Sequence, residues 1–228
     1  MSDRRWKGAC SRSRKTSAAI MTGAFLATGC VSGAFDSEGP QRGVYVITVL
    51  APTPPAAAPL TVDLIVARPS ARPGLDTDRI AVLNADRRLD YYAGGRWGAE
   101  ADVVVQDLLV ESLRNTRRLR TVQGDVSAFS ADYVLQSELN DFQAEYSAGS
   151  GDPVVRVTLE CTLGRVKDRR SLSVFTATAT VPAADNTLGA VVAAFESAYR
   201  QAAASAVDET LTALSAATTP PASADSGN

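Results

Sequence analysis

Hydrophobic and polar residues alternate along several stretches of the chain, and this alternation predicts β-strands with one buried face. It is cleanest in Val154–Val166, where valine, leucine and Cys161 alternate with arginine, threonine and glutamate. The run Gly43–Leu50 is apolar on both faces, which predicts a buried strand. The predicted strands are Gly43–Leu50, Leu60–Ala67, Arg79–Leu83, Arg88–Tyr92, Leu119–Gln123, Tyr133–Phe142, Val154–Val166 and Leu172–Val181. Gly94-Gly95 and Lys167–Arg170 are predicted to be turns.

Apolar residues at helical spacing predict two longer helices. The first, Ala99–Arg117, begins with acidic residues and ends with arginines, as the helix dipole favours. Its polar residues Asp102 and Gln106 are expected to point away from the core. The second helix spans Leu188–Leu214. Its N-terminal cap is expected to be Asp185, Asn186 or Thr187.

This order of elements predicts the fold. A strand on each side of the first helix predicts a parallel crossover, and the later strands are antiparallel in character. We therefore expect a single α/β domain over residues 43–216, in which two main helices cover a mixed β-sheet with one parallel β-α-β crossover and an antiparallel meander. Residues 217–228 are predicted to be a disordered tail from their composition.

The N-terminal segment resembles a bacterial secretion signal. Six basic residues precede the short apolar stretch Ser17–Cys30, which is too short to span a bilayer permanently. The stretch ends in small residues before Cys30, as in a lipobox, although Ala27 stands where a large aliphatic residue is usual. We expect residues 1–29 to be a signal peptide and residues 30–42 a tether lipidated at Cys30. An ordinary cleaved signal and an uncleaved anchor are the alternatives.

Charge and composition exclude several classes of function. Residues 1–29 contain six of the 23 basic and one of the 25 acidic residues, so the rest carries 17 basic and 24 acidic residues, a net charge of −7. That balance argues against nucleic acid and against electrostatic docking on anionic lipid. The absence of histidine excludes histidine-based catalysis and most catalytic zinc sites. No phosphate-binding loop, nucleophile elbow or later stretch of roughly 18 apolar residues occurs, so we expect neither an enzyme nor a permease, and no cofactor or metal.

Several residues remain candidates for chemistry. Cys161 could be a reactive thiol, although its position among alternating apolar residues favours burial. Asp76 and Asp78 could bind a cation, although a solvated loop is favoured because no fixed set of partners accompanies them. A basic group after the first helix could bind phosphate, although compensation of the helix dipole is favoured. This group consists of Arg114, Arg117, Arg118 and Arg120.

Tyr91, Tyr92 and Trp97 form the richest aromatic cluster of the chain. Tyrosine and tryptophan are enriched at interaction hot spots. We interpret Trp97 as structural, fastening the start of the first helix to the sheet. Structural and partner-binding roles are equally open for the two tyrosines, and adjacent strand residues face opposite sides, so one is expected to point outward. Tyr91 and Tyr92 are therefore the candidate partner-binding residues.

Five segments of the sequence carry a resemblance to a known family. They are RIAV at Arg79–Val82, LDYYAGGRW at Leu89–Trp97, LLVESL at Leu108–Leu113, DYVLQSELNDFQAEY at Asp132–Tyr146 and AFESAYRQAA at Ala194–Ala203. With these segments the chain resembles the ABC-type transport auxiliary lipoprotein family, which includes the lipoproteins of MCE-type lipid transport systems. The resemblance runs from about Val44 to Leu214, and the long Pro/Ala loop at Ala51–Pro59 departs from it.

The resemblance implies a non-enzymatic lipoprotein that works beside an MCE-domain protein, a permease and an ATPase, in lipid movement between inner and outer membranes. In bacteria with two membranes, an aspartate directly after the lipidated cysteine tends to keep a lipoprotein at the inner membrane. Here Val31 follows Cys30, which implies the periplasmic face of the outer membrane. A homo-oligomer is a further expectation. Two rivals stay open: an envelope-assembly or secretion lipoprotein on a similar scaffold, and a secreted hydrolase. Candidate acids for the hydrolase are Asp76, Asp78 and Glu160.

Overall fold

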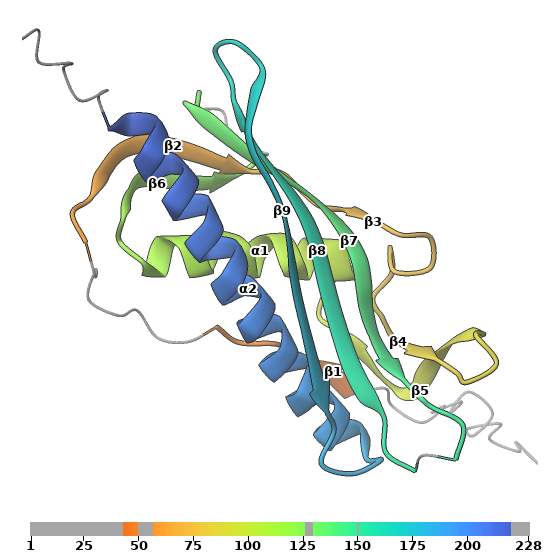
Figure 1. Ribbon diagram of the computed structural model, residues 1–228. Helices are drawn as coiled ribbons and strands as arrows, with labels where there is room; N and C mark the ends of the chain where they lie inside the picture. Colours follow the sequence, from red (N-terminus) through yellow and green to blue (C-terminus); the bar gives the residue numbers. More distant parts are fainter. Residues whose placement is uncertain (1–42, 50–56, 126–129, 150, 220–228) are drawn as a thin grey trace, which may run out of the picture. The chain divides into compact units, whose positions relative to one another are not determined.

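The computed structural model describes residues 43–49, 57–125, 130–149 and 151–219. These residues form a nine-stranded mixed β-sheet and two helices (Figure 1). Cys30, the predicted signal peptide, the predicted tether and residues 220–228 of the predicted tail lie outside the described residues. The elements in chain order are β1 Gly43–Tyr45, β2 Leu60–Val66, β3 Ser70–Ala71, β4 Arg79–Leu83, β5 Leu89–Trp97, α1 Ala101–Asn115, β6 Leu119–Gly124, β7 Tyr133–Glu145, β8 Val154–Arg165, β9 Arg170–Pro182 and α2 Leu188–Thr218.

Strand β7 organises the sheet. One of its edges pairs antiparallel with β8, and β8 pairs antiparallel with β9, which confirms the predicted meander. Its other edge pairs in parallel with β2, β3 and β4 in succession. Strand β6 follows α1 and pairs in parallel with β2 rather than with β5, the strand directly before the helix, so the parallel crossover leads from β2 to β6. The predicted α/β fold is therefore confirmed.

The hydrophobic core lies between one face of the sheet and the two helices. The inward positions of β8 are completely buried, as the alternation predicted, and β2 buries Val62, Leu64 and Val66 on the same side. The two helices contact each other there, because the Tyr199 hydroxyl of α2 donates a hydrogen bond to the Val105 carbonyl of α1 at 3.4 Å. The buried inward residues of β8 are Val155, Val157, Leu159, Cys161 and Leu163.

Trp97 closes the core at the end of β5. Its side chain is completely buried, with its ring centroid 5.5 Å from that of Phe142 and 5.1 Å from that of Phe195. These three residues come from β5, β7 and α2, so one aromatic cluster joins the sheet to the second helix. Its burial in this cluster supports a structural role for Trp97, although the ring contacts join the sheet to α2 rather than to the start of α1.

The prediction of a buried strand at Gly43–Leu50 is wrong. Strand β1 has only three residues and pairs with β5 alone, at the edge of the sheet. Because nothing described covers its outer side, Val44 and Val46 are 54% and 70% exposed. Ile47, by contrast, enters the core. An apolar run at a sheet edge thus has the composition of a buried strand without its burial.

The predicted turn at Gly94-Gly95 is also wrong, because β5 continues through both glycines to Trp97. Instead of forming a turn, the glycines leave room for side chains of two other elements that lie close to β5. A Cβ atom on Gly95 would lie 2.5 Å from the Tyr45 ring and 2.8 Å from Leu188 Cδ2. Glycine is needed at this position to admit β1 and the start of α2.

Helix α1 lies within the predicted range, and α2 begins at the predicted residue but ends at Thr218, four residues beyond the predicted Leu214. Residues 217 and 218, predicted to belong to a disordered tail, are therefore helical. Arg117 follows α1 with φ of 51°, in the left-handed conformation that commonly ends helices. Thr187 caps α2, and its side chain accepts a hydrogen bond from the Ala190 N–H. However, Asp102 and Gln106 are buried rather than exposed, which contradicts the prediction. Their partners, described below, explain this difference.

Candidate functional site

Tyr91 is fastened within the domain by both its hydroxyl and its ring. The hydroxyl donates to the Gly74 carbonyl at 3.0 Å, and the Arg79 guanidinium lies 3.8 Å from the ring centroid. The side chain therefore ties β5 to the loop before β4. Because the residue is half-buried, part of it remains open to solvent, but its polar group is already engaged.

Tyr92 points to the other side of β5 and joins a second hydrogen-bonded chain. Its hydroxyl lies 2.9 Å from that of Tyr146, and Tyr146 donates to Asn186, just before α2. Burial and this hydrogen bond raise the pKa of Tyr92 above its ordinary value. The structure thus places the two candidate tyrosines on opposite sides of β5 rather than together. Neither hydroxyl is free for a partner.

The segment after β1 is held against α2. Thr48 donates from its backbone N–H and its hydroxyl to Glu196, and the Arg200 guanidinium donates to the Thr48 carbonyl at 3.2 Å. Arg200 and Glu196 themselves form an ion pair at 2.6 Å. The first described residues of the chain are therefore fastened to the long helix.

Arg68 and Asp102 fix the start of α1, and this pairing was missed in the sequence. Arg68 follows β2 and donates to both carboxylate oxygens of Asp102, at 2.7 and 3.0 Å. Gln106, one turn further along α1, donates to the Val66 carbonyl at 3.0 Å and to Asp125 at 2.9 Å. These contacts satisfy backbone and charged groups at the rim of the sheet, which is why both polar residues are buried.

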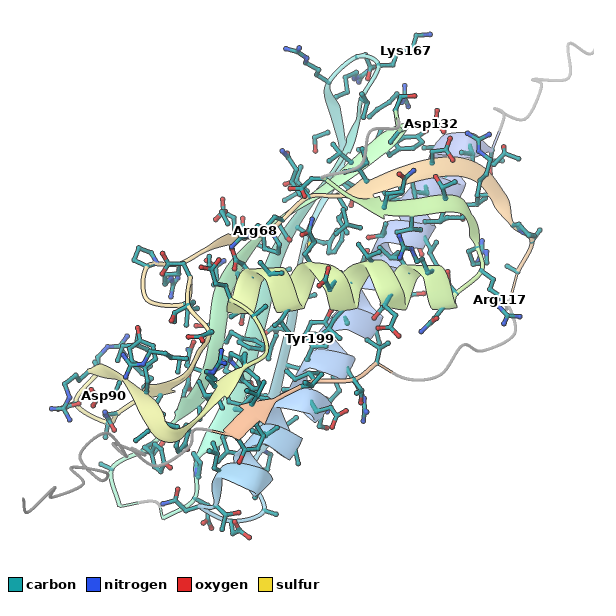
Figure 2. All side chains as sticks on the ribbon, turned by 180° about the vertical axis from the view of Figure 1, so that it is seen from behind. Arg68, Asp90, Arg117, Asp132, Lys167 and Tyr199 are labelled. Atoms are coloured by element: carbon teal, nitrogen blue, oxygen red, sulfur yellow. The ribbon has the colours of Figure 1, made fainter. Side chains whose placement is uncertain are left out.

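The arginines after α1 do not converge on one site. Arg114 donates to the Val122 carbonyl at 2.8 Å, and Arg118 donates to the Ala58 carbonyl at 3.0 Å. Arg120 pairs with Asp63 and lies 3.4 Å from Asp132. Figure 2 shows Arg117 at the end of α1, away from Asp132. The arrangement supports structural roles for this group rather than a phosphate site.

The candidate acids are likewise separate. Asp76 accepts a hydrogen bond from the Gly74 N–H in its own loop, and Asp78 pairs with Arg96 at 3.0 Å. Glu160 lies on β8, where its carboxylate is 3.4 Å from the Asn140 amide. Within the described ranges, no group of three or more cysteine or acidic residues is placed to hold a metal ion.

Cys161 lies in the core, as its alternation predicted. The residue is completely buried on the helix-covered side of β8. Burial raises the pKa of its thiol to about 12. Since the thiolate is the nucleophile, this cysteine is held in its unreactive form.

Neither helix covers the other face of the sheet, which we call the open face. The alternation in the sequence indicated that its residues are polar, but not that the face is uncovered. Along β8 and β9 its residues are mostly polar and partly or fully exposed, with Val174 as an exposed apolar residue, while the covered face is apolar. Thr158 and Thr178 lie opposite each other, with their hydroxyl oxygens 3.0 Å apart. A polar hollow of ≈ 330 Å³ lies on this face, between β7, β8 and the segment after β2. The threonines of the open face are Thr158, Thr162, Thr176, Thr178 and Thr180.

The fold and these surfaces define a two-layer α/β module with one helix-covered and one open sheet face. Comparison with known proteins then identifies the family. A family model for the ABC-type transport auxiliary lipoprotein component matches residues 45–207. The chain belongs to this family, as its sequence segments predicted. The family is one of auxiliary transport lipoproteins rather than of enzymes, which associates the chain with an ABC-type system and the cell envelope.

Solved structures agree with the family. The chain is similar to a crystal structure of a DUF330 protein from Xanthomonas campestris, with 27% sequence identity, a TM-score of 0.71 and coverage of 77% of this chain and 98% of that chain. It also resembles a crystal structure titled only as an uncharacterized protein, with 13% identity, a TM-score of 0.54 and coverage of 74% and 97%; this likeness concerns the fold alone. No curated protein matches the sequence. Among the described helices, none is long and apolar enough to cross a membrane.

Proposed function

We propose that the chain is a non-enzymatic auxiliary lipoprotein of an MCE-type lipid transport system, anchored in the cell envelope. It would hold a protein-binding module at the membrane surface, beside an MCE-domain protein whose permease and ATPase are separate subunits. The lipid would move between inner and outer membranes past this assembly. The observation that carries the proposal is the family match over residues 45–207, which covers most of the described domain.

The attachment would come from Cys30. Fatty acylation of this residue would anchor the chain without a spanning helix, since two or more acyl chains hold a protein stably to a membrane. Val31 follows the cysteine, so we place the anchor at the periplasmic face of the outer membrane. The 13 residues from Cys30 to Arg42 would form the tether to β1. The bonds from Thr48 to α2 support this arrangement, because they fasten the tethered end to the core.

The β5 region is the proposed contact for the partner. Tyr91 and Tyr92 use their hydroxyls internally, so a partner would meet the exposed parts of their rings. This distinction gives a matched pair of variants. Changing Tyr91 to phenylalanine keeps the ring, whereas changing it to alanine removes it. Partner recovery is expected to survive Tyr91→Phe and to fall with Tyr91→Ala, provided that both variants remain folded by circular dichroism.

Co-isolation from membranes tests the proposal. The full chain with a C-terminal tag is purified from detergent-solubilised membranes after mild cross-linking, and its partners are identified by mass spectrometry. We expect an MCE-domain protein together with a permease and an ATPase. Recovery of a cell-wall synthase or a secretin instead would favour the rival function in envelope assembly or secretion, and would overturn the proposal.

Cys30→Ser is the control for the anchor. We expect this variant to leave the membrane fraction and to lose most of the co-isolated transport subunits. A Cys30→Ser protein that stays in the membrane fraction and keeps its partners would show that lipidation is not what holds the chain there.

A further inference from the structure

Strand β9 forms an edge of the sheet. Its partner strand among the described residues is β8, which separates it from β7 (Figure 1). The strand runs for 13 residues, from Arg170 to Pro182. An edge of this length presents a row of backbone N–H and C=O groups that another strand can pair with.

The edge at β9 lacks the features that usually keep such edges from pairing. Natural edge strands are commonly short, or carry charges or proline. The described edge strand β1 has three residues, and β6 has six residues and carries Arg120. From Ser171 to Val181, β9 contains no charged residue and no proline. Of these three edges, β9 is the longest, and its charged residue and its proline, Arg170 and Pro182, stand only at its two ends.

The outward side of β9 remains exposed although α2 packs on its inward side. Ala177 and Ala179 are buried on that inward side. In contrast, Val174 is 63% exposed, and the threonines that alternate with the alanines are exposed as well. Val174 is one of four large hydrophobic residues that are exposed in the described part of the chain. This side is therefore uncharged, partly apolar and uncovered by either helix.

The two ends of β9 carry opposite charges. At its start Lys167, Arg169 and Arg170 outnumber Asp168, which pairs with Arg165 of β8 at 3.4 Å, and Figure 2 shows Lys167 at the tip of the hairpin that joins β8 to β9. Asp185 follows its other end, where its carboxylate accepts a hydrogen bond from the Thr187 N–H. When two antiparallel copies of such a strand lie side by side, each basic end meets an acidic end. The charges therefore favour a second copy of this strand over a parallel or random approach.

We propose that β9 pairs antiparallel with β9 of a second copy, about a two-fold axis at Thr176. Thr176 is the middle residue of the strand, so this register sets Arg170 opposite Pro182 and brings Lys167 toward Asp185 of the second copy. The two sheets become one continuous sheet, and the interface is the same patch on both copies. The pairing does not depend on the transport partner proposed above. It gives the expected homo-oligomer a surface and a symmetry.

A cysteine at the axis tests the register directly. Residues directly opposite in an antiparallel pair have Cα atoms about 4.5–5.5 Å apart, which lies within the Cα separation of roughly 4.4–6.8 Å that a disulfide spans. Thr176→Cys in the full-length, membrane-bound protein should therefore form a dimer on mild oxidation. Thr180→Cys is the matched control, because the two copies of residue 180 would lie roughly 27 Å apart. Both positions are exposed threonines, and the unmodified protein sets the background from its own cysteines.

We expect about ten-fold more disulfide-linked dimer from Thr176→Cys than from Thr180→Cys, since cysteines with Cα atoms more than about 7 Å apart cannot be bridged. Equal cross-linking of the two variants, or none in either while both remain folded, would overturn the proposal. So would a cross-link from Thr176→Cys to a protein of different mass, which would show that β9 binds another partner. As a second measurement, Thr176→Lys would place two like charges opposite each other. This variant should be monomeric by light scattering with its circular dichroism spectrum unchanged, and a dimer that persists would contradict the two-fold pairing.

Discussion

The two faces of the β7–β8–β9 meander are made of the same strands, yet they differ in what they contact. On the face toward the helices, the alternate residues of β8 are completely buried and apolar. On the other face, the residues between them are polar and reach solvent, and they pair with one another across strands, as Thr158 does with Thr178. The first face provides the hydrophobic stabilisation of the fold. The second face contributes little to that stabilisation.

We expect the largest loss of stability from removing the Trp97 side chain in the core on the covered face of the sheet. Trp97→Ala would remove a completely buried ring that contacts Phe142 and Phe195, and would leave a cavity. We expect a loss of about 3–5 kcal/mol in the free energy of unfolding, measured by urea denaturation. Thr178→Val, on the open face, is the matched control and should change stability by less than about 0.5 kcal/mol. Similar losses in the two variants would contradict the division between the faces.

An intermediate effect is expected at the rim between the faces, where Arg68 meets Asp102. Asp102→Ala would remove both hydrogen bonds from the guanidinium at the start of α1. Since hydrogen bonds to charged groups contribute about 1.5–3 kcal/mol, we expect a loss in that range in urea unfolding. Glu100→Ala, which removes the more exposed partner of Arg68, should cost less than Asp102→Ala. A larger loss from Glu100→Ala than from Asp102→Ala would show that the burial of Asp102 does not determine how much this ion pair stabilises the fold.

The smallest effect is a pH dependence on the open face, at Asp63. A hydrogen bond from Arg120, helped by one from Thr121, lowers the pKa of Asp63 from 3.8 to about 2. Because the folded pKa lies below the unfolded one, this contribution is complete above about pH 4 and is lost as the pH falls toward 2. Stability should therefore decline over this window in urea unfolding at several pH values. Asp63→Asn should flatten that part of the profile, and an unchanged slope would assign the decline to other carboxylates.

The sequence was sufficient to predict those helices and strands in which every second or every third to fourth residue faces the same layer of the core. Alternation in β8 and the apolar stripe of α2 predicted both their type and their buried side, because each residue sees the same layer as the residue two or four positions away. The sequence was not sufficient to predict burial at the edge of the sheet. The apolar run at Gly43–Leu50 reads as buried, but burial depends on whether a strand has neighbours on both sides, and β1 has one.

Other failures have the same origin in long-range contacts. Asp102 and Gln106 are drawn inward by groups far away in the sequence, including Arg68, which precedes Asp102 by 34 residues. Gly94-Gly95 has the composition of a turn, but Tyr45 and Leu188 approach it from both ends of the domain. The roles of Tyr91 and Tyr92 as partner contacts stay predictions. The exposed edge at β9 could not be predicted, since alternation identifies a strand but not whether it is the last in its sheet.

Mass spectrometry of the mature protein, purified from fractionated cells, tests the central claim most directly: that a lipid holds this protein-binding module against the envelope. The account predicts that the chain begins at Cys30, that this residue carries fatty acyl groups, and that the protein is in the membrane fraction. An unmodified cysteine at that position, with all of the protein in the soluble fraction, would contradict it.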